Sequence, residues 1–172
     1  MKFNTFIFMS MLLLFFSCSS VMKLDSFKDP DYNQTTFDNI LIQVDSNEIS
    51  TRKSVEDNAN KNFELKGIKS LQSYKILYPT RSYTDNETRY ISLGKRIPAI
   101  LKINIIESGY SDQKPHFNIR MEIIDVTNGK IVWTADGYNG GNGLDDLDYI
   151  YNKFFQRLAT KLIEEKIIST IN

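Results

Sequence analysis

Hydrophobic and polar positions alternate most regularly between residues 99 and 135, and this pattern predicts three strands. In a strand at 99–108, one side would carry the apolar residues 101, 103 and 105. In a strand at 117–126, one side would carry the apolar residues 117, 119, 121 and 123. Alternation with period two is typical of a strand with one buried face. Asn128-Gly129 is a strong hairpin signal and leads into a third strand at 130–135. We therefore expect an antiparallel meander.

Two strand–helix units are predicted before the meander. The first has an apolar strand at 40–44 and a helix that begins at Ser46 or Ser50 and ends near Leu65. The second has a strand at 71–78 and a short helix that is opened by the capping box Thr84 to Glu87 and ends near Gly94. Apolar positions are sparse in the first helix, so we expect it to lie on the surface.

The last predicted element is an amphipathic helix over about 145–168. Its apolar residues recur three and four positions apart and would cover the sheet: Leu147, Ile150, Tyr151, Phe154, Phe155, Leu158 and Leu162. The order βαβαβββα predicts an α/β (α+β) fold with a mixed sheet covered by helices, as a single domain over residues 37–172.

The first residues are typical of a signal peptide. Lys2 precedes an apolar stretch from Phe6 to Phe16, which is far shorter than the roughly 20 residues of a membrane-spanning helix. The following Ser17-Cys18 resembles the lipobox of bacterial lipoproteins. We expect residues 1–17 to be removed and Cys18, the only cysteine, to carry the lipid (diacylglycerol and palmitate). The alternatives are an ordinary secretory signal with a free or buried thiol, or an uncleaved N-terminal anchor.

The resemblance to lipoproteins implies a location. Ser19 and Ser20 follow the cysteine, in place of the aspartate that retains proteobacterial lipoproteins at the inner membrane. This implies the periplasmic face of the outer membrane, with the inner membrane and the cell surface as alternatives. Residues 18–36 are polar, contain Pro30 and lack periodicity, so we expect a flexible tether with a reach of roughly 25 Å.

Charge and side-chain chemistry argue against two classes of function, nucleic-acid binding and catalysis. The 172 residues carry 21 basic and 21 acidic side chains, so nothing favours nucleic acid as a partner. His116 is the only imidazole and is expected in an exposed loop, and Glu107, Glu122 and Asp125 are expected to face solvent. Because no hydrolase, metalloprotease or phosphate-loop motif is present, we expect no enzymatic activity.

The segment Gly140 to Asp148 matches the calcium-binding nonapeptide Gly-Gly-x-Gly-x-Asp-x-U-x. That motif binds calcium between stacked repeats, and this chain has one copy. We therefore expect a tight loop whose aspartates cap and charge the last helix. Beyond the lipid on Cys18 we expect no cofactor or metal. A calcium- or glycan-binding module at loop 137–148 stays open as the alternative, with these candidate ligands: Gly141, Gly143, Asp145, Asp146 and Asp148.

A family resemblance covers most of the chain after the signal peptide. In chain order, its features are first the lead Lys28-Asp29-Pro30 before a strand, and then a helix that contains Arg52 and Glu56. A strand ending in Pro79 follows, and Leu93-Gly94 precedes an isoleucine-rich strand. The last feature is the hairpin Asp125-x-x-x-Gly129-x-Ile131-x-Trp133. This pattern resembles small envelope lipoproteins related in fold to the curli secretion lipoprotein and the penicillin-binding-protein activator. The resemblance implies a non-enzymatic assembly or regulatory protein, whose sheet or last helix docks an envelope protein partner.

Overall fold

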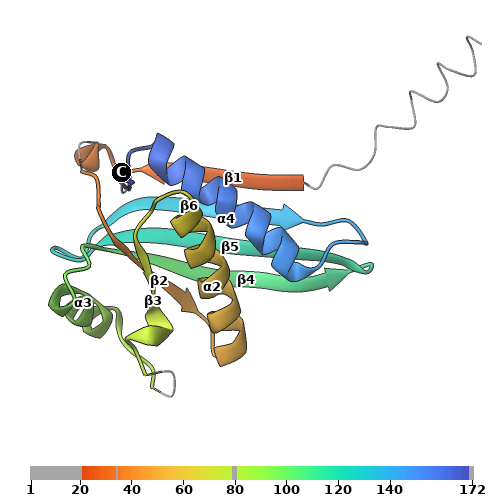
Figure 1. The fold of residues 1–172 in the computed structure, drawn as a ribbon, viewed down its shortest axis with the longest axis horizontal. Coiled ribbons are helices and arrows are strands. Elements are labelled where there is room, and N and C mark those ends of the chain that lie inside the picture. Colours follow the sequence, from red (N-terminus) through yellow and green to blue (C-terminus); the bar gives the residue numbers. More distant parts are fainter. Residues whose placement is uncertain (1–20, 34, 79–80, 171–172) are drawn as a thin grey trace, which may run out of the picture.

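The computed structural model describes residues 21–33, 35–78 and 81–170 (Figure 1). These form one mixed α/β domain with a six-stranded, open sheet in the order β1-β6-β5-β4-β2-β3, which confirms the predicted fold class. The strands are β1 (Val21–Lys28), β2 (Ile40–Asp45), β3 (Ser70–Gln72), β4 (Ala99–Ser111), β5 (Lys114–Asp125) and β6 (Ile131–Gly140). The helices are α2 (Ile49–Leu65), α3 (Asp85–Gly94) and α4 (Leu147–Glu164), with 3-10 turns η2 (Pro30–Tyr32) and η3 (Ser73–Lys75).

The sheet has a parallel part and an antiparallel part. β2 runs parallel to both β3 and β4, whereas β4, β5, β6 and β1 are successively antiparallel. The predicted meander is confirmed, and its turn lies at the expected residues, where Gly129 has a φ of 76° and donates its N–H to the Asp125 carbonyl. The capping box at Thr84 is also confirmed, and its two hydrogen bonds join Thr84 and Glu87.

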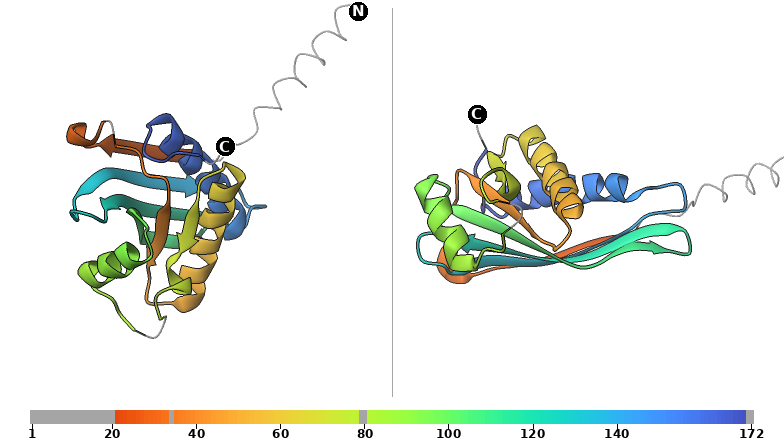
Figure 2. Two further views of the ribbon diagram at one scale, coloured as in Figure 1. Left: turned by 60° about the vertical axis from the view of Figure 1, so that its left-hand side comes forward. Right: turned by 90° about the horizontal axis from the view of Figure 1, so that it is seen from below.

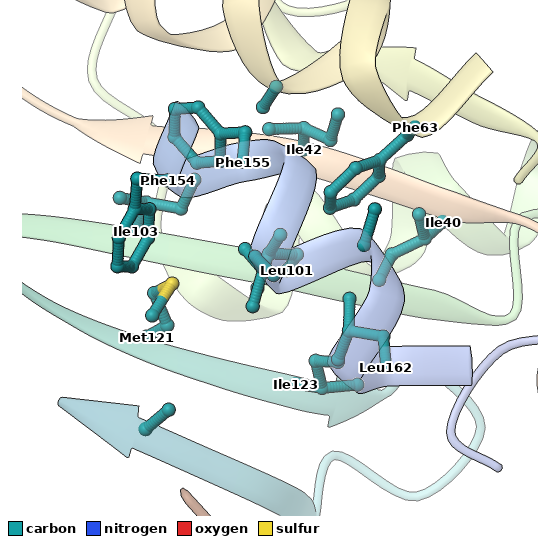
Figure 3. Packing of buried hydrophobic residues seen from close by; sticks show 14 of the residues in the cluster. Ile40, Ile42, Phe63, Leu101, Ile103, Met121, Ile123, Phe154, Phe155 and Leu162 are labelled. Carbon is teal, nitrogen blue, oxygen red and sulfur yellow. The ribbon is translucent and has the colours of Figure 1, made fainter. Parts of the chain in front are cut away.

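Helices α2 and α4 lie side by side over one face of the sheet (Figure 2). Figure 3 shows Phe63 of α2 and Phe154, Phe155 and Leu162 of α4 pointing at the strands. There they meet a row of buried strand residues: Ile40, Ile42, Leu101, Ile103, Met121 and Ile123. Each such buried side chain contributes roughly 1.5–3 kcal/mol relative to exposure, so this layer provides most of the stability of the fold. With buried residues such as Val55, Ala59 and Phe63, α2 belongs to the core more than its sparse pattern predicted.

Gly137 is a strand residue that permits close helix packing. A Cβ at this position would lie 2.3 Å from the Phe154 ring, a distance that real structures do not tolerate. Phe154 therefore sits directly against β6 and meets the Phe117 ring edge to face at 5.1 Å. The glycine-rich loop predicted at 137–148 thus begins later than expected, because residues 137–140 pair with β5 and β1.

The predicted tether is wrong from residue 21 onward. Residues 21–28 form β1, which pairs along its length with β6, so these residues belong to the domain, which therefore does not begin at residue 37. An edge strand needs few apolar residues because it has one neighbour and one buried face, and within residues 22–28 Leu24 is the one buried apolar side chain. The chain then turns at η2, and Phe37 pairs with Ile168.

The strand predicted at 71–78 is also shorter in the structure. β3 ends at Gln72, and η3 follows at Ser73–Lys75. The cause is a side chain from another element, since Glu56 of α2 accepts hydrogen bonds from the Ser73 hydroxyl and the Tyr74 N–H. A tertiary contact thus ends the pairing before the apolar run does.

Candidate interaction surface

Cys18 and the predicted signal peptide at 1–17 lie outside the described residues. Lipidation therefore stays a prediction. Within the described part of the chain, no helix has both the length and the apolar character needed to cross a membrane.

The aspartates of the glycine-rich loop are engaged in local structure. Asp145 accepts a hydrogen bond from the Asn142 N–H at 2.8 Å, and Asp146 is the N-cap of α4, where it accepts from the Tyr149 N–H at 2.7 Å. Asp148 faces α2 and contacts the Ser54 hydroxyl at 3.2 Å and the Asn58 amide at 3.3 Å. Each carboxylate thus has a different partner.

The loop is therefore the N-terminal capping segment of α4, as the sequence predicted. Asp145, Asp146 and Asp148 fix the first turn of α4 and join it to α2. Among residues 21–33, 35–78 and 81–170, no three His, Cys, Asp or Glu side chains are grouped as metal ligands. Gly141 is required for packing, because a Cβ there would lie 2.8 Å from Pro115, whereas Gly143 is open on all sides.

His116 lies within β5 and not in an exposed loop, so that prediction is wrong. Its side chain is largely buried, and Nε2 lies 3.2 Å from the Glu107 carboxylate of β4. Strand pairing continues to Lys114, past the point where the apolar alternation stops, and this carries His116 into the sheet.

Asp125 is buried, contrary to the expectation that it faces solvent. Its carboxylate accepts from the Thr127 N–H at 2.8 Å, the Thr127 hydroxyl at 2.6 Å and the Asn128 amide at 3.0 Å. These bonds close the β5–β6 turn. The sequence signal was the Asp-x-Thr-Asn-Gly run itself, in which Asp commonly binds the backbone two residues on.

One face of the sheet is covered by α2 and α4, and most of the other is uncovered (Figure 2). A small apolar cluster containing Ile97, Ile100 and Val126 is buried on that side, at the end of the sheet where β4 begins. The remainder, which we call the open face, is formed by the side chains that alternate with the core residues of four strands. They are Lys23, Asp25, Phe27, Lys102, Asn104, Glu107, His116, Asn118, Arg120, Glu122, Thr134, Asp136 and Tyr138.

Charged side chains form rows across the open face. Asp25 pairs with Asp136, which in turn pairs with Arg120, and the Arg120 Nε donates to the Asp136 carboxylate at 2.9 Å. Two aspartates directly opposite each other on adjacent strands destabilise a sheet, and Arg120 offsets this repulsion by pairing with Asp136. With the exposed Phe27 and with Thr134, these residues line a shallow depression of about 380 Å³.

A second row contains Glu122 and Lys102. The Lys102 ammonium donates to Asp85 of α3 at 2.8 Å. Burial alone would lower the pKa of Lys102, but Asp85, Asp45 and Glu122 together raise it. Lys102 therefore stays charged and joins α3 to the margin of the open face.

Comparisons with known proteins show the fold. No protein-family model and no curated protein matches the sequence. Among solved structures, the PelC dodecamer from Paraburkholderia phytofirmans is 14% identical, with 86% of this chain and 99% of that chain covered and a TM-score of 0.60. The lipoprotein GNA1162 from Neisseria meningitidis is 13% identical, with 74% and 96% covered and a TM-score of 0.46. The LpoB C-terminal domain from Salmonella enterica is 13% identical, with 62% and 85% covered and a TM-score of 0.40.

The likeness to PelC concerns the fold alone. At 14% identity it shows that this chain shares the fold of the PelC subunit, and it transfers no residue role. The two matches with TM-scores below 0.5 carry no further argument.

Proposed function

We propose that this protein is a non-enzymatic, membrane-anchored lipoprotein that acts as an interaction or assembly component of the bacterial cell envelope. The anchor is the lipid on Cys18, and the location is the periplasmic face of the outer membrane. Support for assembly comes from PelC, which shares the fold and forms a dodecamer.

The open face is the observation that carries this proposal. Phe27 is 64% exposed there and Tyr138 is 38% exposed, although neighbouring positions are charged. The opposed Asp25 and Asp136 weaken the isolated sheet, and a partner that supplies positive charge would relieve their repulsion. Aromatic side chains within a polar surface are typical of protein interfaces. The last helix is a weaker candidate because α4 uses its apolar stripe in the core.

The proposal is tested by site-specific photo-crosslinking in cells that produce the full chain. The photoreactive residue p-benzoylphenylalanine replaces Phe27 or Tyr138 on the open face, and Tyr90 of α3, which is 73% exposed, serves as the matched control. We expect a discrete crosslinked product from the two open-face positions and none from Tyr90. A product at a multiple of the chain mass would indicate self-assembly, and a product at another mass would indicate a second envelope protein.

One crosslinking result would contradict the proposed docking surface. If Phe27 and Tyr138 give no discrete product, or give the same products as Tyr90, the open face is not the docking surface. An interaction role at this face would then be wrong.

A further inference from the structure

The N-terminal end of β1 determines where the lipid anchor meets the domain. Two residues separate Cys18 from Val21, so the two Cα atoms lie at most about 11 Å apart, whatever the conformation between them. In β1, Val21 pairs with Gly140, and Gly140 pairs with His116 of β5. The turn between β4 and β5 and the loop from Gly141 to Asp146 extend beyond this row, at the right-hand end of Figure 1.

This end of the molecule, which we call the anchor end, carries exposed apolar and aromatic side chains. Leu144 is 97% exposed, Tyr110 is 58% exposed and Tyr149 is 44% exposed. Tyr110 lies near the tip of the β4–β5 hairpin and lines a groove of about 390 Å³ with Leu147 at the start of α4. The three exposed side chains thus come from the end of β4, the loop before α4 and the first turn of α4, at the end of the sheet where β1 begins.

The polar groups beside Leu144 are engaged in local hydrogen bonds. The Asn142 side chain accepts from the Leu144 N–H at 2.9 Å, Asp145 binds the Asn142 N–H, and Asp146 caps α4. The Lys153 ammonium lies 4.4 Å from the centre of the Tyr149 ring. This leaves Leu144 projecting from a loop whose nearest carboxylates are already hydrogen-bonded.

We propose that the anchor end rests on the membrane surface, with Leu144 in the interfacial region of the bilayer and Tyr110 and Tyr149 beside it. This inference rests on the proposed lipid anchor. An acyl chain on Cys18 holds Val21 close to the bilayer, which brings the anchor end there as well. Tyrosine is enriched at membrane interfaces, where its ring lies among apolar groups and its hydroxyl stays hydrated. The domain therefore contacts the membrane at a fixed place and does not stand away from it.

Quenching of tryptophan fluorescence by brominated phosphatidylcholine tests this contact. The acylated full-length Leu144→Trp protein is purified from membranes and reconstituted into vesicles with and without the brominated lipid. The unsubstituted protein gives the baseline from buried Trp133, and Tyr90→Trp on exposed α3 is the matched control. We expect loss of the emission that Leu144→Trp adds to the baseline, and no loss for Tyr90→Trp.

The outcomes separate this inference from the proposed function. If the acylated protein remains on the vesicles after an alkaline wash but the Leu144→Trp emission is as insensitive to bromine as that of Tyr90→Trp, the contact is wrong and the anchor stands. If the protein carries no acyl group or washes off, both the anchor and the contact are wrong.

Discussion

Replacement of Glu56 by alanine is expected to lower the free energy of unfolding by about 3 kcal/mol, because it leaves buried donors without acceptors. The Glu56 side chain is fully buried between α2 and the sheet. Its carboxylate accepts from the Val44 N–H at 3.1 Å, the Ser73 hydroxyl at 2.6 Å and the Tyr74 N–H at 3.2 Å. Alanine removes all three bonds and also leaves a cavity. Urea unfolding followed by Trp133 fluorescence measures the loss.

Glu56→Gln is the matched control, because it keeps the size of the side chain and one carbonyl acceptor. Its loss should be smaller than that of Glu56→Ala. Equal losses for the two variants would show that the hydrogen bonds of Glu56 contribute little.

The same glutamate predicts a pH dependence with a definite sign. Burial raises the pKa of Glu56, and its hydrogen bonds from Ser73, Val44 and Tyr74 offset part of that effect. A carboxyl group whose folded-state pKa is raised contributes stability below its unfolded pKa and loses it as pH rises through the folded pKa. The stability of the wild type relative to Glu56→Gln should therefore fall as pH rises from about 4, near the ordinary glutamate pKa. If the free energy of unfolding of the wild type relative to that of Glu56→Gln rose with pH, this prediction would be wrong.

The second large effect is expected for Glu165, which joins the end of α4 to β1 and β6. Its carboxylate accepts from the Trp133 Nε1 at 2.5 Å and the Ser26 hydroxyl at 2.7 Å, and Lys161 lies 3.1 Å away. Glu165→Ala leaves the indole N–H of a buried tryptophan without this acceptor, so we expect a loss of about 2 kcal/mol. Because Ser26 also loses its partner, amides of residues 21–28 should exchange faster with deuterium.

Glu164→Ala is the control for Glu165, since Glu164 is the exposed neighbour at the end of the same helix. It should leave both stability and exchange in β1 nearly unchanged. Burial works to raise the pKa of Glu165, but the bonds from Ser26, Trp133 and Lys161 outweigh it and lower the pKa. The stabilisation by Glu165 should therefore decline as pH falls through that lowered value. Equal exchange rates in both variants would show that Glu165 does not hold β1.

The parts of the fold that depend on local pattern could be predicted from sequence. The meander, the Thr84 capping box and α4 each depend on residues close together in the chain, and the structure has all three. β1 could not be found in this way, because Leu24 is the one buried apolar residue within 22–28 and leaves almost no pattern. The early end of β3 depends on Glu56, which lies 17 positions before Ser73.

The open face could be predicted only in part. Alternation indicates which residues of β4 and β5 oppose the core residues, so Arg120 and Glu122 could be expected there. The pairing of Asp25 with Asp136 depends on the register between β1 and β6, which lie far apart in the sequence. Nor could the anchor end be predicted, since a flexible tether over 18–36 would have separated Cys18 from the domain.

The central claim is a lipid anchor on Cys18, and it is tested most directly by the mass of the N-terminal peptide of the protein purified from membranes. The account predicts a peptide that begins at Cys18 and carries diacylglycerol on that residue, with residues 1–17 absent. A peptide with an unmodified Cys18, whether residues 1–17 are retained or cleavage occurs elsewhere, would contradict it.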